Sequence, residues 1–421
     1  MQIVLALALA SLVTATPLYE RAPSSYPAPN TRGPAPKQEW IATYEAAKAA
    51  GKIPGFAPAF LTAAGAPAYA AGVDTGENGV CSWTVSHCFG DGDVYDAPDG
   101  MYALGFDDGP LPASVELYNF LESNNQTATH FHIGSNILNN KEIFDLAVST
   151  GGHIAVHTWS HPYMSTLTDL EILGELGWTA QIIYDYSGLV PKWWRPPYGD
   201  TDDRVRAIAR EVFGLTLAGW AFDSSDWCLN EAGSSSCVGS GPANQADLVG
   251  ELRSWQAGPK SPGVLGLEHE LTSHSVGAFI ATYSGIKQHG WDARCIPDLF
   301  GADWYLNGVR DNVTEPGVSI GSGPHDAAAP APSSATSSSA VSASTASFAT
   351  SSSGSASSAT ATAASSFTTI VSSPGSSTSA AATVQSQQAP TTETRTSAAA
   401  RGRLVAPAAL AALAVLAAAA T

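Results

Sequence analysis

The chain has 421 residues, of which 19 are basic and 37 acidic, so its formal net charge is −18 at pH 7. This excess of acid argues against nucleic acid as a partner, because no basic surface is evident to neutralise phosphates. Charged residues make up 13% of the chain, well below the typical value of roughly 25%. A long C-terminal tail of Ser, Thr and Ala dilutes them, and neutral polymers stay open as partners.

The beginning of the chain reads as a targeting segment. Residues 1–15, MQIVLALALASLVTA, combine an apolar run with a small-x-small end and are too short to span a bilayer and then stop. We interpret them as a secretory signal peptide; the alternative is a buried N-terminal helix. Two N-glycosylation sequons, at Asn125 and Asn312, also fit an exported protein.

The other end of the chain is typical of a lipid-anchor signal. Residues 404–421 form a continuous apolar run, preceded by small residues that include Ser397. We interpret residues 397–421 as a GPI-anchor signal with Ser397 as the candidate attachment site. The alternative is a plain tail-anchoring helix.

Between these ends the composition divides the chain into three regions. Residues 327–396 lack the apolar periodicity needed to offset ordering entropy, and their Ser, Thr and Ala content predicts a disordered, O-glycosylated stalk or an unmodified flexible linker. Residues 16–75 are rich in Pro and Ala, which predicts a loosely ordered extension with one helix at 38–50. The folded domain is therefore expected at residues 76–310.

This domain alternates strand and helix signals along the chain. The expected strands cover residues 101–106, 129–133, 153–157, 215–222 and 263–267, and residues 192–195 lead into a Pro-Pro loop. The expected helices cover residues 112–123, 141–150, 168–186, 201–213, 245–255 and 276–289. Such alternation predicts an α/β fold with a parallel sheet. About seven units would close, or nearly close, into a distorted (β/α) barrel, in which chemistry lies at the C-terminal ends of the strands.

All five cysteines fall inside the predicted domain. Cys228 and Cys237 flank a Gly- and Ser-rich loop and are expected to pair locally. Cys295, near the end of the domain, could close the chain onto Cys81 or Cys88, which would leave one thiol over. The cysteine spacing does not match a zinc knuckle, because CxxC is missing from the sequence.

Polar side chains gather where four of these strands end, and a fifth cluster opens a loop. The five clusters are residues 107–110, 157–162, 195–199, 223–227 and 268–270, with residues 195–199 in the loop.

These clusters contain the groups needed for metal-assisted hydrolysis. His157 and His161 stand four residues apart and, on a helical turn, would point at one metal ion. One carboxylate of the pair Asp107 and Asp108 would complete a set of two histidines and one aspartate. Successive side chains at a strand end point in different directions, so the other carboxylate could take a proton from a water whose pKa the cation lowers. A histidine on the opposite wall could protonate the leaving group, which predicts hydrolysis of an amide or ester.

The segments LGFDDGP, HTWSHP, RPPYG, DSSDW and LEHEL resemble the five ordered motifs of the polysaccharide deacetylases, carbohydrate esterase family 4 with its NodB-type domain. They most resemble those of fungal chitin deacetylases. The match covers about residues 100–300 and is specific, because five motifs appear in the right order. It implies a NodB-type barrel that removes acetyl groups from N-acetylglucosamine units of chitin, giving chitosan and acetate. The signal peptide, stalk and anchor signal resemble the membrane-anchored forms found in the fungal cell wall.

The resemblance also assigns the central roles. Asp107 is similar to the catalytic base and His269 to the general acid. Asp108, His157 and His161 look like the ligands of one divalent metal, with zinc the usual ion and cobalt the alternative.

Supporting roles follow from the same motifs. Arg195 is similar to the residue that orients the base, and Asp226 to the one that holds and tunes the acid. Tyr198 is expected to offer its backbone N–H to the oxyanion. Trp227 and Leu267 are expected to wall the pocket that receives the acetyl methyl group.

Neighbouring residues carry weaker expectations. Glu268 and Glu270 flank His269, and nearby carboxylates would raise the pKa of that histidine. Arg204, Arg206 and Arg210 are expected on a solvated helix face. Three tryptophans could stack on sugars only if exposed, and burial is the commoner fate: Trp159, Trp193 and Trp194.

Three alternatives remain beside a chitin deacetylase. Motifs fix chemistry more than substrate, so the polymer could be another acetylated glycan such as xylan or peptidoglycan. A chitin-binding protein without turnover and a structural wall mannoprotein are the others. The expected partners are a chitin-type substrate and a membrane reached through the GPI lipid, with no nucleic acid, and we expect a monomer.

Overall fold

The structure, a computed structural model, describes residues 26–324 apart from residues 238, 311 and 316. The predicted signal peptide, the stalk and the anchor signal with Ser397 lie outside these residues. All described residues belong to one compact unit of the chain. None of the helices formed by the described residues is long and apolar enough to cross a bilayer.

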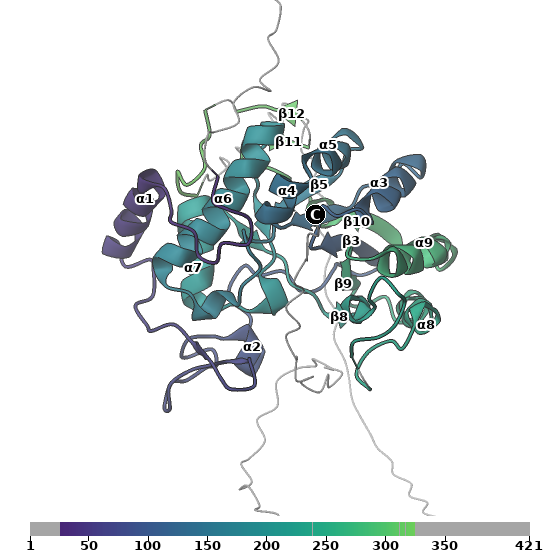
Figure 1. The fold of residues 1–421 in the computed structure, drawn as a ribbon, viewed down its shortest axis with the longest axis horizontal. Helices are drawn as coiled ribbons and strands as arrows, with labels where there is room; N and C mark the ends of the chain where they lie inside the picture. Colours follow the sequence, from purple (N-terminus) through teal and green to yellow (C-terminus); the bar gives the residue numbers. More distant parts are fainter. Residues whose placement is uncertain (1–25, 238, 311, 316, 325–421) are drawn as a thin grey trace, which may run out of the picture. The chain divides into compact units, whose positions relative to one another are not determined.

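The fold is an α/β architecture built on one curled parallel sheet (Figure 1). The sheet order is β7-β6-β5-β4-β3-β9-β8, with β10 also paired to β3, and every neighbouring pair is parallel. Among the described residues β7 and β8, at the two ends of the order, are not paired with each other, so the sheet is an open, partial barrel. The strands are β3 (Met101–Asp107), β4 (Thr129–His132), β5 (His153–Val156), β6 (Trp193–Trp194), β7 (Thr216–Leu217), β8 (Phe222–Asp223), β9 (Val264–His269) and β10 (Asp292–Cys295).

Helices surround this sheet and confirm the predicted alternation (Figure 1). The longest, α6, begins after a capping box of Thr168 and Glu171 and ends at Gly188, whose left-handed φ of 76° suits glycine. The helices are α1 (Gln38–Ala49), α2 (Trp83–Ser86), α3 (Ser114–Ser123), α4 (Gly134–Asn139), α5 (Lys141–Ser149), α6 (Asp169–Ser187), α7 (Asp203–Phe213), α8 (Gln245–Gln256), α9 (Ser273–Gln288) and α10 (Ile296–Leu299). Short pairs β1 (Phe60–Leu61) with β2 (Pro67–Ala68), and β11 (Gly308–Val309) with β12 (Asn312–Val313), lie outside the main sheet.

One predicted strand is wrong. Residues 215–222 form two short strands, β7 and β8, rather than one. Between them the carbonyl oxygens of Ala218 and Gly219 accept hydrogen bonds from the Arg195 side chain, both at 2.9 Å. Because these two acceptors are used by a side chain, the run does not continue as a single ladder strand.

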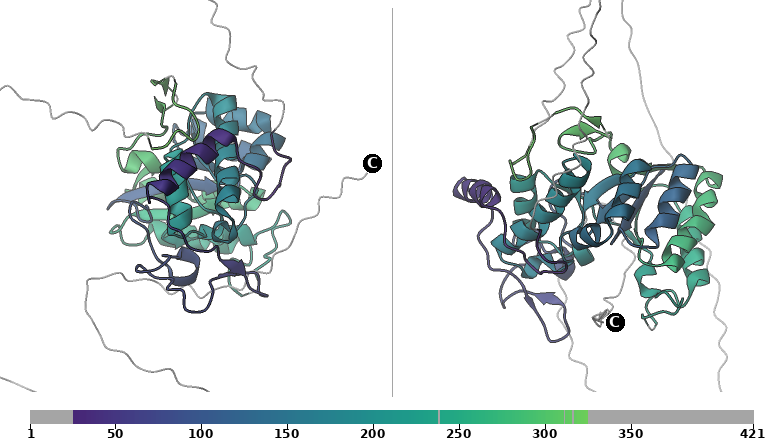
Figure 2. Two further views of the ribbon diagram at one scale, coloured as in Figure 1. Left: turned by 90° about the vertical axis from the view of Figure 1, so that its left-hand side faces the viewer. Right: turned by 45° about the horizontal axis from the view of Figure 1, so that its top comes forward.

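The prediction of loose order is wrong for residues 26–75. Trp40 on α1 is fully buried in the main hydrophobic core and donates from Nε1 to the Ile320 carbonyl at 3.1 Å. α1 packs on α6 and α7 (Figure 2), and the close approach of Trp40 and Pro34 leaves no room for a Cβ at Gly177 and Gly174. Aromatic anchors fix this segment to the domain, although its Pro and Ala content suggested disorder.

Two of the three arginines expected on a solvated face are buried, whereas Arg210 is exposed as expected. Arg204 is 1% exposed and Arg206 is 6% exposed. Arg204 pairs with Asp169 at 2.8 Å, and Arg206 pairs with Asp93 at 2.7 Å. These ion pairs connect α7 to α6 and to the loop before β3, so the arginines have a structural role.

The cysteine prediction is half confirmed. Cys228 pairs with Cys237 as expected. Cys81 pairs with Cys88, and Cys295 is a buried free thiol, so the proposed link from Cys295 to the start of the domain is wrong. Cys295 ends β10 and is fully buried in the sheet.

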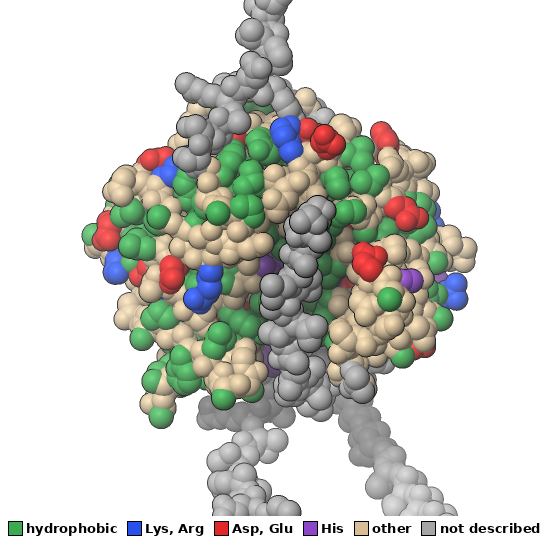
Figure 3. Space-filling view, in the orientation of Figure 1, with side chains coloured by type: hydrophobic (Ala, Val, Ile, Leu, Met, Phe, Trp, Pro, Cys, Tyr) green, Lys and Arg blue, Asp and Glu red, His purple; other side chains and the backbone are tan. Residues whose placement is uncertain are grey.

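The surface agrees with the charge balance. On the face drawn in Figure 3 the basic side chains are scattered among acidic ones and form no continuous patch of described residues. Charged side chains take up only a small part of that face, among hydrophobic side chains, other uncharged side chains and backbone. The expectation that nucleic acid is not a partner stays a prediction, since no bound partner tests it. Asn125 and Asn312 are both exposed, so both sequons are accessible.

The anchoring of the N-terminal segment predicts a large loss of stability on Trp40→Ala. Removing a fully buried aromatic side chain costs about 3–5 kcal/mol, so the midpoint of urea unfolding should fall strongly. Leu170→Ala on α6, where the side chain is 45% exposed, is the matched control and should change stability by under about 0.5 kcal/mol. Equal unfolding midpoints for Trp40→Ala and the wild type would show that residues 26–75 are not part of the cooperative unit.

His153 predicts a pH dependence of stability. It is fully buried on β5, and burial lowers its pKa from the ordinary value to about 3, although Nε2 donates to the Trp304 carbonyl. The unfolded chain therefore binds an extra proton between about pH 6.5 and pH 3, and the stability from this group is lost as pH falls through that window. In His153→Gln the loss of stability between pH 7 and pH 4 should be smaller. The exposed control His289→Gln should unfold with the wild-type pH dependence; a His153→Gln variant that does the same would contradict the assignment.

Candidate functional site

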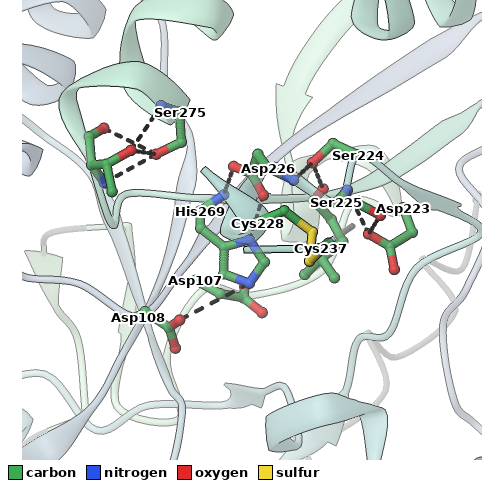
Figure 4. Close-up of polar contacts among 12 residues, drawn as sticks. Asp107, Asp108, Asp223, Ser224, Ser225, Asp226, Cys228, Cys237, His269 and Ser275 are labelled. Atoms are coloured by element: carbon green, nitrogen blue, oxygen red, sulfur yellow. Dashed lines mark hydrogen bonds and ion pairs between the residues drawn. A yellow bond between two sulfur atoms is a disulfide. The ribbon is translucent and has the colours of Figure 1, made fainter. Parts of the chain in front are cut away.

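The predicted polar clusters meet at the C-terminal edge of the sheet. Asp107 ends β3 and His269 ends β9, and the parallel register places these two residues opposite each other. The loops after β5 and β6 bring His157 and Arg195 to the same edge, where His157 Nδ1 lies 2.7 Å from the Arg195 carbonyl oxygen. Figure 4 shows Asp107, Asp108 and His269 side by side. The structure thus brings residues from separate motifs together at one edge of the sheet.

Three side chains form a group suited to one cation. Asp108 Oδ1 lies 3.3 Å from His157 Nε2 and 3.3 Å from His161 Nε2, and the potential ligand atoms all lie within 4.8 Å of one another. Because His157 Nδ1–H donates to the Arg195 carbonyl, the Nε2 lone pair faces the group. Asp108 Oδ1 is buried without a hydrogen-bond partner, an arrangement that a cation would satisfy. Two imidazoles and a carboxylate fit a divalent ion such as zinc.

The two histidines do not lie on a helical turn, as the spacing suggested. Residues 157–161 form a loop in which Thr158 has φ 66° and His161 has φ 58°, both left-handed. Asp108 also has a left-handed φ, of 73°. The two rings lie close together, with centres 5.0 Å apart, but a strained loop rather than helical periodicity brings them there.

A buried glutamate holds this loop. The Glu175 carboxylate on α6 accepts from the backbone N–H groups of Trp159 and Ser160, each at 2.8 Å, and from the Ser160 hydroxyl at 2.6 Å. It also accepts from the Gly33 N–H at 2.7 Å. Burial raises the pKa of Glu175, and these hydrogen bonds oppose that rise. Glu175 was not predicted as a site residue; an acidic residue on the apolar side of the helix 168–186 was the available signal.

Asp107 is held by a fully buried arginine. Arg195 Nη1 lies 2.7 Å from Asp107 Oδ1, and the guanidinium carbon lies 4.3 Å from the centre of the Phe131 ring. The other carboxylate oxygen of Asp107 lies 3.7 Å from His157 Nε2, one of the candidate ligand atoms. One oxygen of Asp107 is thus fixed by charge pairing, while the other faces the cation group.

His269 is held on the opposite side by Asp226 (Figure 4). Asp226 Oδ1 lies 2.6 Å from His269 Nδ1, and Asp226 Oδ2 accepts from the His269 backbone N–H at 2.7 Å. His269 Nε2 points toward Asp108 Oδ2, 4.0 Å away. Burial alone would lower the pKa of His269, but Asp226 first, and then Asp108 and Asp107, raise it to about 10. The ring therefore holds a proton at neutral pH.

The prediction that Glu268 and Glu270 raise the pKa of His269 is wrong, because the carboxylates that raise it are those of Asp226, Asp108 and Asp107. Glu270 pairs with His130, with Oε1 3.1 Å from Nδ1, and with His132 at 3.6 Å. Burial raises the pKa of Glu268 to about 8, so it is mostly uncharged at pH 7. Side chains alternate along β9, which turns both glutamates to the face opposite His269.

The remaining site residues lie around this centre. Asp226 and Trp227 lie on the short 3₁₀ turn Asp226–Cys228, which the Cys228–Cys237 disulfide closes (Figure 4). Leu267 is buried on β9 opposite Asp223. Tyr198 has a left-handed φ of 59°.

The rings near the site differ in exposure. The three tryptophans considered as sugar platforms are at most 3% exposed and cannot stack on a ligand: Trp159, Trp193 and Trp194. The Tyr198 ring, by contrast, is 40% exposed. It lies 4.6 Å from the ring of His161, between ring centres. An aromatic surface is therefore available next to the candidate ligands, but from tyrosine rather than tryptophan.

Known proteins are similar in sequence to the region that contains this site. The family model described as polysaccharide deacetylase matches residues 95–217. Chitin deacetylase 3 of Cryptococcus neoformans is 42% identical over 252 residues, which cover 59% of this chain and 60% of that relative. Chitin deacetylase of Amylomyces rouxii is 39% identical over 163 residues, covering 37% of this chain and 38% of the relative. The chain thus spans less than two thirds of the length of these curated relatives.

A solved structure completes the comparison. The chitin deacetylase from the fungal pathogen Colletotrichum lindemuthianum has 20% identity and a TM-score of 0.45, with 51% of this chain and 94% of that chain covered.

The geometry of the cation group predicts how binding responds to mutation. The wild type should bind one equivalent of Zn²⁺, and His161→Ala should weaken that binding by more than about 100-fold, because loss of a direct ligand exceeds the 10–100-fold effect of an outer-shell partner. Metal competition titration with a chromogenic chelator measures this. The exposed control His289→Ala should bind as the wild type does. A His161→Ala protein with unchanged affinity would remove His161 from the ligand set.

Proposed function

We propose that this chain is a metal-dependent chitin deacetylase, which hydrolyses the acetamide of N-acetylglucosamine units to give chitosan and acetate. The observation that carries the proposal is the placement of two opposed proton-transfer groups around one cation group. Asp107, paired with Arg195, lies on one side, and His269, paired with Asp226, lies on the other. The printed names of the relatives support the choice of chitin.

The proposed ion is one divalent metal, zinc first and cobalt as the alternative. Asp108, His157 and His161 would hold it. When bound, such a cation lowers the pKa of a water and polarises a carbonyl oxygen. The three ligands lie between the proposed base and acid, which is the place where a substrate carbonyl must enter for both to act on it.

Two residues of the chain carry out the two proton transfers, one as general base and one as general acid. Asp107 removes the proton from the attacking water, and Arg195 keeps its carboxylate oriented. The Tyr198 backbone N–H donates to the carbonyl oxygen as negative charge develops there. His269, protonated because of Asp226, gives its Nε2 proton to the amide nitrogen as the carbon–nitrogen bond breaks. Water is consumed, and acetate and a glucosamine unit are released.

The remaining assignments are part of the same proposal. Trp227 and Leu267 form the pocket for the acetyl methyl group, next to the His269–Asp226 pair. The enzyme is secreted as a monomer and glycosylated, with residues 1–15 as signal peptide, residues 327–396 as stalk and residues 397–421 as GPI signal. It acts in the cell wall while anchored to the membrane. Two disulfides within the described residues support an exported protein.

The direct test is acetate release from N-acetylglucosamine oligomers by the secreted protein. Release should stop with a chelator and return with added zinc. Asp107→Asn should lower kcat by about 10²- to 10⁴-fold while zinc binding persists, because Asp107 is not one of the three ligands. The exposed control Asp292→Asn should keep wild-type activity.

Acetate release from different polymers tests which substrate the chain uses. Acetate from acetylxylan or peptidoglycan, with none from chitin oligomers, would keep the chemistry but replace the substrate. Folded, zinc-loaded protein that releases acetate from none of these polymers would overturn the enzyme proposal.

A further inference from the structure

A cavity of about 240 Å³ lies directly beside the candidate metal ligands. One of its walls belongs to the loops after β5 and β6 and includes His161, Tyr163 and Tyr198. The rings of Tyr163 and Tyr198 stack with centres 4.2 Å apart, and the Tyr198 ring is 40% exposed. The cavity is therefore continuous with the reaction centre through His161 and has an aromatic surface.

The facing wall comes from the N-terminal segment. Asn30, Arg32 and Leu61 line it, and Leu61 is 51% exposed at the β1 hairpin. These residues lie outside the stretch 95–217 that matches the family model. Arg32 Nη2 donates to Thr166 Oγ1 at 2.9 Å, which places the guanidinium at the cavity rim.

Partly buried hydrogen bonds hold this outer wall in place. The Asn30 N–H donates to Ser135 Oγ at 2.8 Å, and the Gly33 N–H donates to Glu175 at 2.7 Å. The same Glu175 carboxylate binds the backbone of the loop that carries His161. The two walls are thus fixed to one another, so the cavity is preformed rather than the gap beside a loose strand.

The lining specifies the chemistry of an occupant. It combines tyrosine rings and an aliphatic side chain with hydrogen-bond donors from Arg32, and it contains no carboxylate among its described residues. A neutral ring with apolar C–H faces and with hydroxyl and amide oxygens as acceptors suits it, whereas a cationic amine finds no counter-charge there. The volume lies below the roughly 300–1,000 Å³ of pockets for drug-sized ligands, which suits a single sugar unit.

We propose that the N-terminal segment completes a binding subsite for an N-acetylated sugar unit that neighbours the unit under attack. This inference rests on the proposed function, and it makes Arg32 and Leu61 determinants of substrate selection. Longer acetylated oligomers would bind more tightly than N-acetylglucosamine alone, because their second unit reaches this cavity.

The test is direct binding, so it does not depend on turnover. In an Asp107→Asn background, binding of the N-acetylglucosamine tetramer is measured by calorimetry, and binding of N-acetylglucosamine itself by NMR titration. Arg32→Ala and Leu61→Ala should each weaken tetramer binding by roughly three- to tenfold and leave monomer binding within about twofold. Both side chains are exposed, so the unfolding midpoint should stay at the parent value. Arg294→Ala, at an exposed arginine paired with Asp292, is the control with the same charge change and should bind the tetramer as the parent does.

Three outcomes would overturn the inference: unchanged tetramer affinity in both variants, an equal loss for tetramer and monomer, or no tetramer binding by the parent. The proposed function fails on a different result. Tetramer binding that depends on Arg32, with no acetate released by the chain that retains Asp107, would support the subsite and refute the deacetylase.

Discussion

The site depends on one buried charge, the guanidinium of Arg195. A fully buried arginine is costly unless it is paired and its hydrogen bonds are satisfied. Here it pairs with Asp107 and donates to two backbone carbonyls, and its own carbonyl accepts from His157. A single residue directly after β6 thus orients the proposed base and one proposed ligand. It also explains why the chain between β7 and β8 leaves the sheet, since the carbonyls of Ala218 and Gly219 face the guanidinium.

A second buried group, the Glu175 carboxylate, orients the loop that carries His157 and His161. Its carboxylate gathers the N–H groups of the ligand loop and of the N-terminal segment, which would otherwise be buried donors without partners. The segment that composition marks as an extension is therefore structurally part of the site. Trp40 packs the N-terminal segment into the hydrophobic core, and α1 packs on α6, the helix that carries Glu175. The same helix therefore contacts both the core and the loop of the proposed ligands.

The sequence predicted what local signals encode. Strand and helix alternation gave the parallel sheet, and the motif residues Asp107, Asp108 and His269 do lie together at strand ends. Contacts between distant segments were not predictable in the same way. The hydrogen bonds of Glu175 and the burial of Trp40 depend on partners more than a hundred residues away in several cases. The predicted link from Cys295 to the start of the domain failed for the opposite reason, because Cys81 pairs with its near neighbour Cys88.

Backbone strain gathers where the proposed chemistry is placed. Asp108, Thr158, His161, Tyr198 and Ser225 all have left-handed φ values between 52° and 73°, and each lies at or next to a proposed site residue. Such conformations cost of order 1–3 kcal/mol each for residues other than glycine and persist only where the surroundings enforce them. The buried networks around Arg195 and Glu175 supply that enforcement at the cation group. Because both networks bond directly to the loop and the carboxylate of the site, the geometry of the cation group depends on these two buried charges.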